Sequence, residues 1–135
     1  MVQKKKNIIL LVDNNINRRN NLGTRLRMLG YTPEVCSSGM QAISLLEKSD
    51  KARITYRSIL IIGDSEDMPG REVMLLMREI EKDKGTLPIL IVDEDNDPEN
   101  ILQAIHEGAN DYIVDVNNDV KIVKKLQKIA PLLEE

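Results

Sequence analysis

The apolar residues of the chain fall into five short runs separated by stretches with a helical period. Each run is nearly continuous and leaves neither face polar, which is typical of parallel strands covered by helices on both sides. They therefore predict five buried strands. The runs are Ile8 to Val12, Val35 to Cys36, Ile59 to Ile62, Ile89 to Val92 and Tyr112 to Val114.

Apolar residues at helical spacing follow each run and predict five helices. Local signals mark several helix ends. Gly30 and Gly108 end the first and fourth helices, Ser38 caps the second, and Pro98 opens the fourth. The positions expected to face the core are Leu22, Leu26 and Leu29; Ala42, Ile43, Leu45 and Leu46; Val73, Leu76, Met77 and Ile80; Ile101, Leu102 and Ile105; and Val120, Val123, Leu126 or Gln127, and Ala130, with Met28 and Met74 beside them.

Strands and helices alternate with no internal linker, which favours an α/β fold with a doubly wound parallel sheet. One reversal of the chain gives the flavodoxin-like strand order 2-1-3-4-5. That order places the functional crevice at the carboxyl ends of the strands, near the first and third. We expect residues 1–135 to form one domain. The chain stops soon after the last predicted helix, so this domain is expected to stand alone or to be cut from a longer protein.

Composition narrows the range of functions. The chain holds 19 basic and 22 acidic residues, a single His and a single Cys, and it lacks Phe and Trp. One His and one Cys are too few for the usual zinc sites and leave little material for a Cys-His pair or a Ser-His-Asp triad, so we expect no enzyme of those classes. Acidity and the missing aromatics argue against nucleic-acid binding. No apolar stretch is long enough for a membrane span, and we expect a cytoplasmic protein.

Carboxylates stand at the predicted ends of four of the five strands. Asp13 precedes Asn14 after the first strand, Asp64 follows the third, Asp93 the fourth and Asp115 the fifth. Aspartate is also a common turn residue, so each of them alone is more simply structural. Several of them at one crevice would form a site for a hard cation such as Mg²⁺, with Asp13 and Asp64 as ligands.

Several segments, in this order and spacing, resemble the receiver domain of two-component response regulators over nearly the whole chain. They are the opening IILLVDNNINRR, LGY before the second strand, CSSGMQAI after it, MPG after the third, and EGANDYIV around the fifth. The resemblance implies the same five-unit fold. It also implies transfer of a phosphoryl group from a histidine kinase to an Asp after the third strand, with Mg²⁺, a hydroxyl residue and a Lys around it.

The chain departs from the family pattern at most of these chemical positions. Asn14 replaces one acid of the metal-binding pair, Asp93 stands at the hydroxyl position, and Asp115 stands at the Lys position. The phosphoacceptor position has three readings. Asp64 follows the strand directly, spacing from Met68 and Pro69 leads to Ser65, and an ungapped match leads to Ile62.

These exchanges predict a degenerate receiver, or pseudo-receiver, that is not switched by ordinary phosphorylation. A phosphorylated Asp needs cations around it, and two additional carboxylates would repel it instead. The alternative keeps Asp64 as phosphoacceptor, with Mg²⁺ at Asp13 and an unusual cation such as Arg18 or Arg19. A nucleotide- or flavin-binding domain is a weaker third hypothesis, because no phosphate-binding loop follows the first strand.

Receivers of this family communicate through the face made by the fourth helix, fifth strand and fifth helix. Tyr112 matches the aromatic residue that switches on this face, although an ordinary strand residue would look the same in sequence. The implied partner is a protein: a histidine kinase, an output domain or another regulator. The charge is polarised, because residues 58–119 hold 16 acids and 4 bases while residues 1–57 hold 4 acids and 11 bases.

Overall fold

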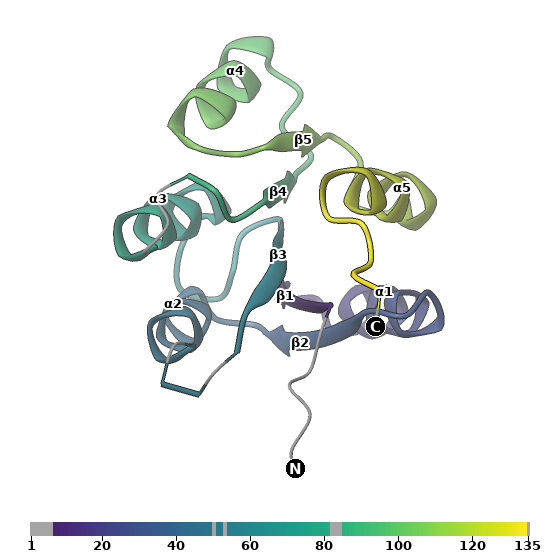
Figure 1. Cartoon of the computed structure of the whole chain (residues 1–135). Helices are drawn as coiled ribbons and strands as arrows, with labels where there is room; N and C mark the ends of the chain where they lie inside the picture. The colour runs from purple at the N-terminus through teal and green to yellow at the C-terminus, as the bar shows by residue number, and fades with distance from the viewer. Residues whose placement is uncertain (1–6, 50, 53, 82–84, 135) are drawn as a thin grey trace.

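A computed structural model describes residues 7–49, 51–52, 54–81 and 85–134. Five parallel strands form one sheet in the order β2-β1-β3-β4-β5, which confirms the predicted topology (Figure 1). The strands are β1 (Ile8–Val12), β2 (Thr32–Cys36), β3 (Tyr56–Ile62), β4 (Ile89–Val92) and β5 (Asp111–Ile113).

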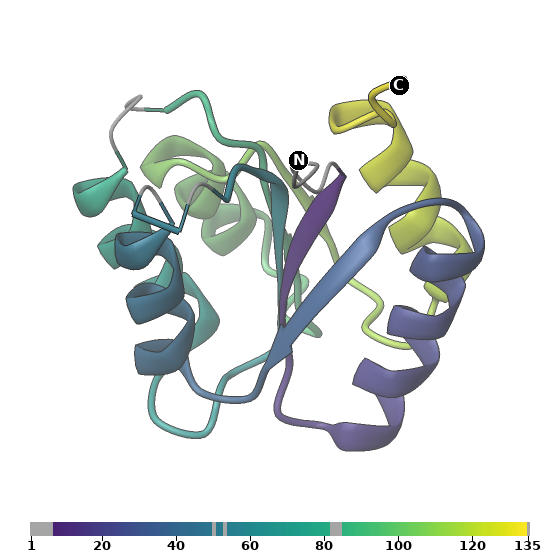
Figure 2. The same cartoon turned by 60° about the horizontal axis from the view of Figure 1, so that its bottom comes forward.

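Helices cover both faces of the sheet, as right-handed crossovers require. Helices α1 and α5 lie side by side on one face, α2 and α3 lie on the other, and α4 lies beside the edge strand β5 (Figures 1 and 2). This is the flavodoxin-like arrangement that the alternating pattern predicts. The helices are α1 (Ile16–Met28), α2 (Gly39–Lys48), α3 (Gly70–Ile80), α4 (Pro98–Glu107) and α5 (Asp119–Ile129).

The core consists of two apolar layers, one on each face of the sheet. Alternate residues of β1 feed the two layers, so that Leu10 packs toward α2 and α3 while Leu11 packs toward α1 and α5. All five residues of β1 are buried, as expected of an inner strand in a covered sheet. Cys36 lies in the first of these layers.

The sequence signals for helix ends are confirmed. Ser38 caps α2 by accepting a hydrogen bond from the backbone of Gln41, and Pro98 lies in the first turn of α4. Gly30 and Gly108 follow the ends of α1 and α4 with φ values of 102° and 131°, a conformation that favours glycine. Among the described helices, none is long and apolar enough to cross a membrane.

Several side chains that we expected in the core are exposed instead. Met28 is 82% exposed, Leu102 is 69% exposed and Val120 is 51% exposed. The reason is geometric. Helix α4 flanks a three-residue edge strand and buries only Ala104, while Met28 and Val120 lie at helix ends, beyond the cover that the sheet provides. The apolar stripes of α1, α4 and α5 are therefore only partly buried in the core.

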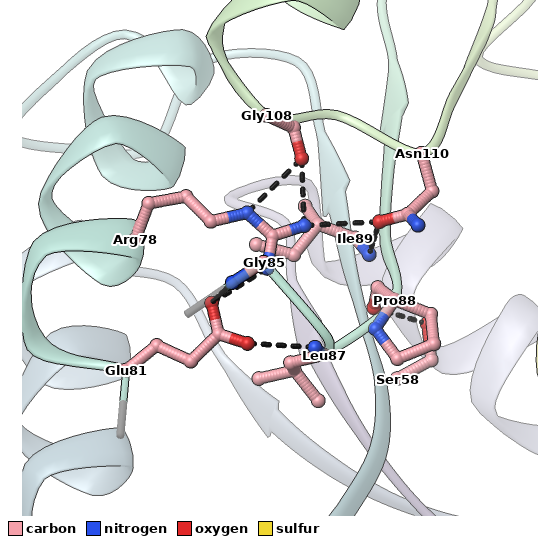
Figure 3. Close-up of polar contacts among 9 residues, drawn as sticks. All are labelled: Ser58, Arg78, Glu81, Gly85, Leu87, Pro88, Ile89, Gly108 and Asn110. Atoms are coloured by element: carbon pink, nitrogen blue, oxygen red, sulfur yellow. Dashed lines mark hydrogen bonds and ion pairs between the residues drawn. The ribbon is translucent and has the colours of Figure 1, made fainter. Parts of the chain in front are cut away.

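A polar cluster joins α3 to the amino-terminal ends of β4 and β5 (Figure 3). Arg78 donates to the carbonyl oxygen of Gly108 through Nε at 3.0 Å and Nη2 at 2.6 Å, and to Oδ1 of Asn110 at 2.9 Å. Its Nη1 pairs with Glu81 at 2.6 Å. Asn110 in turn accepts the backbone N–H of Ile89. This cluster fixes the strand ends opposite the crevice.

Candidate functional site

Asp13 lies at the carboxyl end of β1 and is fully buried. Its carboxylate accepts two hydrogen bonds from the Arg18 guanidinium, from Nε to Oδ2 and from Nη2 to Oδ1, each at 2.7 Å. The backbone N–H of Asn15 donates to Oδ1 at 3.0 Å. Both carboxylate oxygens are therefore already occupied by groups of the chain itself.

The first turn of α1 positions Arg18. Asn15 caps this helix by accepting the Arg18 backbone N–H at 3.0 Å, which directs the guanidinium toward the strand ends. A Cβ placed on Gly63, directly after β3, would lie 3.6 Å from Nη2 of Arg18. The hydrogen bonds to Asp13 raise the pKa of Arg18, and the charges of Asp13 and Glu94 add to that effect. A fixed positive charge thus stands between the ends of β1 and β3.

The three readings of the phosphoacceptor position differ in their surroundings. Ile62 is buried in the core. Ser65 is also buried, and its Oγ lies 2.9 Å from both Asp67 Oδ1 and the Met68 carbonyl oxygen. Asp64 is exposed, and its Oδ1 accepts the backbone N–H of Gly70 at 3.2 Å, at the start of α3. Asp64 is therefore the candidate with an exposed carboxylate.

The other two strand-end carboxylates accept hydrogen bonds from backbone N–H groups one or two residues further along the chain. Asp93 accepts the backbone N–H of Glu94 at 2.7 Å, and Asp115, which is exposed, accepts that of Asn117 at 3.0 Å. Within the described ranges, no group of three or more Asp, Glu, His or Cys side chains is arranged to hold a metal ion. Because Arg18 occupies Asp13, the residues present do not fit a bound Mg²⁺.

Comparison with known proteins shows which family has this sequence and this fold. The sequence profile of the response regulator receiver domain matches residues 9–127. The chain belongs to this receiver family. It is 28% identical over 124 residues to chemotaxis protein CheY-3 of Vibrio cholerae, covering 90% of this chain and 89% of that protein. It is 27% identical to a response regulator of Rickettsia felis described as NtrX-like, covering 89% of this chain and 24% of that longer protein.

Solved receiver structures share the fold. Vibrio cholerae CheY4 superposes with a TM-score of 0.78 at 26% identity, covering 93% of this chain and 99% of that one. A receiver domain of a sensor histidine kinase from Pseudomonas aeruginosa, described with a magnesium ion coordinated in its active-site cleft, gives a TM-score of 0.76 at 22% identity, covering 93% and 98%. The protein is thus a CheY-like receiver of a two-component signalling system, and such domains are signalling modules that interact with proteins such as histidine kinases.

Asp67 is a site residue of this receiver that sequence reasoning missed. Its Oδ1 accepts a hydrogen bond from the backbone N–H of Gly39 at 2.7 Å. Its Oδ2 accepts one from the backbone N–H of Met40 at 3.1 Å and one from the Ser38 hydroxyl at 3.0 Å. It therefore joins the β3–α3 loop to the start of α2. The N–H of Met40 is the main cause of a pKa lowered to about 2. The sequence signal for Asp67 was the run of acids after β3. The sequence did not show its partners, because only the fold places the start of α2 beside this run.

Tyr112 lies on β5, as predicted, and its hydroxyl donates to the carbonyl oxygen of Asp95 at 2.9 Å. Burial, followed by the charges of Asp93 and Asp95, raises its pKa to about 12. The side chain is half-buried against the layer under α2 and α3. In this receiver, Tyr112 therefore holds the loop between β4 and α4 in place.

Proposed function

We propose that this chain is an atypical receiver module that works by protein-protein contact and is not switched by ordinary phosphorylation. The observation that carries the proposal is the bidentate pair between Arg18 and Asp13. In the proposal, residues 1–135 act as a single receiver unit, alone or within a longer regulator.

The Arg18 guanidinium is well suited to replace a metal ion at Asp13. A planar guanidinium matches a carboxylate with two parallel hydrogen bonds, and its charge does not titrate near neutral pH. Mg²⁺ needs near-octahedral oxygen ligands and gives up its water reluctantly. To bind Asp13 it would have to displace Arg18, whose side chain is only 17% exposed. The built-in cation therefore stands in competition with the metal.

The remaining charges also disfavour a phosphoryl group. A working receiver places a Lys where this chain has Asp115, and a hydroxyl where it has Asp93. Transfer of a phosphoryl group depends mainly on stabilising its negative charge. Two carboxylates at these positions repel that charge, and Arg18 is already neutralised by Asp13.

Treatment with acetyl phosphate and Mg²⁺, followed by intact-mass spectrometry, tests this proposal. We expect the mass of the wild-type chain to stay unchanged, whereas a phosphorylatable receiver treated in parallel gains one phosphoryl group. A gain of one phosphoryl group that disappears in Asp64→Asn would overturn the proposal. Substituting the neighbouring exposed acid as Glu66→Gln is the matched control for loss of charge alone.

The alternative function is phosphorylation at Asp64 with a cation supplied by Arg18. The exposed Asp64 carboxylate and the closeness of Arg18 to Gly63 favour this alternative. It predicts a phosphoryl gain that needs Arg18 and disappears in Arg18→Ala. The atypical receiver predicts no gain in either protein, so the same mass measurement separates the two functions.

The proposed contact surface is the face formed by α4, β5 and α5. Support comes from the weak attachment of α4, whose Leu102 and Ile105 are 69% and 38% exposed, and from the link between Tyr112 and Asp95, which couples β5 to the loop before α4. Exposed apolar side chains surrounded by charged residues are typical of protein contact sites. A histidine kinase, an output domain or another regulator would dock there.

A further inference from the structure

Helix α4 presents an acidic ridge to solvent. Leu102 and Ile105 are three residues apart on one side of the helix, and both are exposed. The loop and first turn before them carry five acids and no base within residues 93–99. In Figure 1 the helix projects from the β5 edge of the sheet. We call α4 with residues 93–97 the acidic ridge.

A groove between α1 and α5 has the opposite character. Its lining includes Met28 at the end of α1, the next residue Leu29, and Val120 from α5, all exposed. Arg25 and Lys124 line it, together with one acid, Asp119. Lys121 and Lys128 lie on the same helix as Lys124 and are exposed. Figure 2 shows α1 and α5 running side by side. We call this feature the basic groove.

We propose that the acidic ridge of one copy docks into the basic groove of a second copy. Leu102 would then cover the exposed Met28 and Val120, and the acids of residues 93–99 would face Arg25 and Lys124. The inference deepens the proposed function, on which it rests, by naming the partner as another molecule of this chain.

Charge decides which surfaces meet. Two acidic ridges placed against each other would bring their carboxylates together, and two basic grooves would bring their Lys and Arg side chains together, both unfavourable. A symmetric dimer through either surface is therefore disfavoured. Ridge against groove is favourable. Residues 93–99 of the ridge carry five acids and no base, whereas Arg25 and Lys124 outnumber the one acid, Asp119, in the groove.

A contact of this kind is heterologous and leaves one ridge and one groove free at the ends of every open assembly. Such contacts build open chains or closed rings, not isolated dimers. We expect the average mass of the wild-type protein to rise with protein concentration over a range on the order of 10 µM to 1 mM, as for a weak, transient contact. Raising the salt concentration should weaken the association, because charges on both surfaces are exposed to solvent.

Two single substitutions test the orientation by sedimentation equilibrium. Leu102→Lys places a positive charge on the ridge, and Met28→Glu places a negative charge in the groove. We expect each variant alone to associate at least about tenfold more weakly than wild type. Mixed together, the two variants should associate again, because one supplies the intact ridge and the other the intact groove.

Met40 provides the matched control, since it is 58% exposed on α2, away from both surfaces. Met40→Lys and Met40→Glu should associate like wild type, and circular dichroism should show all variants folded. A wild-type chain that stays monomeric, or a mixture that fails to associate, would overturn the inference. Association lost with Leu102→Lys but kept with Met28→Glu would instead indicate another partner surface for the ridge. The association measurements and the acetyl phosphate test are independent of each other. Failure of the self-association can therefore be distinguished from failure of the atypical-receiver proposal.

Discussion

Arg18 and Asp13 form a bidentate ion pair at the carboxyl end of β1, with two donor-acceptor distances of 2.7 Å. The carboxylate is fully buried, whereas most ion pairs of proteins lie at the surface and contribute little. A buried pair of good geometry is different, because loss of one partner leaves the other charged and without water. We therefore expect the chain to depend on Arg18 for stability, at the position that the resemblance to receivers assigns to a metal ligand.

The first prediction concerns the removal of this guanidinium. Arg18→Ala should lower the free energy of unfolding by about 3 kcal/mol, because the buried Asp13 carboxylate loses its charged partner. Urea denaturation followed by circular dichroism measures this change. In the same variant, millimolar Mg²⁺ should raise the melting temperature. Without the guanidinium, both oxygens of Asp13 are available to the metal ion, and a ligand that binds only the folded state stabilises that state.

Arg25→Ala is the matched control for the first prediction. Arg25 is an exposed residue of the same helix, so its removal should change the free energy of unfolding by less than about 0.5 kcal/mol. Wild type and Arg25→Ala should not respond to Mg²⁺. A wild-type chain that is stabilised by Mg²⁺ as strongly as Arg18→Ala would contradict the role given to Arg18.

Much of the fold followed from the order of elements in the sequence. Inner strands such as β1 are buried on both faces and therefore appear in the sequence as continuous apolar runs. Strand β2 was harder to delimit, because only Val35 and Cys36 formed a run while the strand begins at Thr32. It is an edge strand with mostly polar or half-exposed positions, and Pro33 is tolerated there. Its first residues therefore carry little hydrophobic signal.

The candidate site was predicted only in outline. The strand-end positions of Asp13 and Asp64 followed from the topology, because strands of a parallel sheet end at the same edge. The pairing of the Asp13 carboxylate with Arg18 did not, since Arg18 and Arg19 are adjacent in sequence and both reach Asp13. Only the structure shows that Arg18 binds the carboxylate while Arg19 donates to the Asp13 carbonyl oxygen at 3.3 Å. Asp67 was missed for a related reason: its partners, at the start of α2, lie about 28 residues away along the chain.

A second prediction follows from Asp67 and concerns pH. Hydrogen bonds, the one from Met40 first, lower its pKa from 3.8 to about 2 in the folded chain. Below pH 4 the unfolded chain takes up this proton before the folded one, so the contribution of Asp67 to stability is complete above about pH 4 and is lost as pH falls toward 2. Asp67→Asn should lower the urea midpoint at pH 5 and flatten its decline between pH 4 and pH 2.5.

The control for this pH profile is Glu66→Gln, which removes the neighbouring exposed acid. Its profile should run parallel to that of wild type. If Asp67→Asn also runs parallel to wild type, the bond from Asp67 to the start of α2 does not form in solution.

A third prediction concerns the polar cluster of Arg78. Its guanidinium holds the carbonyl of Gly108 and the buried Glu81 at once (Figure 3). Arg78→Ala would remove this donor from the buried Glu81 and from the half-buried Gly108 carbonyl, and we expect a loss of about 3 kcal/mol in the free energy of unfolding. Arg71→Ala removes a more exposed arginine, which pairs with Glu107, and should cost about 0.5 kcal/mol. Equal losses in the two variants, measured by urea denaturation, would argue against the cluster.

The fourth prediction concerns Tyr112, whose hydroxyl holds the carbonyl of Asp95 at 2.9 Å. With a pKa raised to about 12 by burial and nearby acids, this hydroxyl keeps its proton at all moderate pH values. Tyr112→Phe should therefore cost about 1 kcal/mol and increase hydrogen exchange in residues 93–99 (measured by mass spectrometry). Tyr31→Phe is the control, because it loses a similar bond to the Ala130 carbonyl. If both variants raise exchange in residues 93–99 equally, the effect is global destabilisation, and Tyr112 does not anchor the acidic ridge.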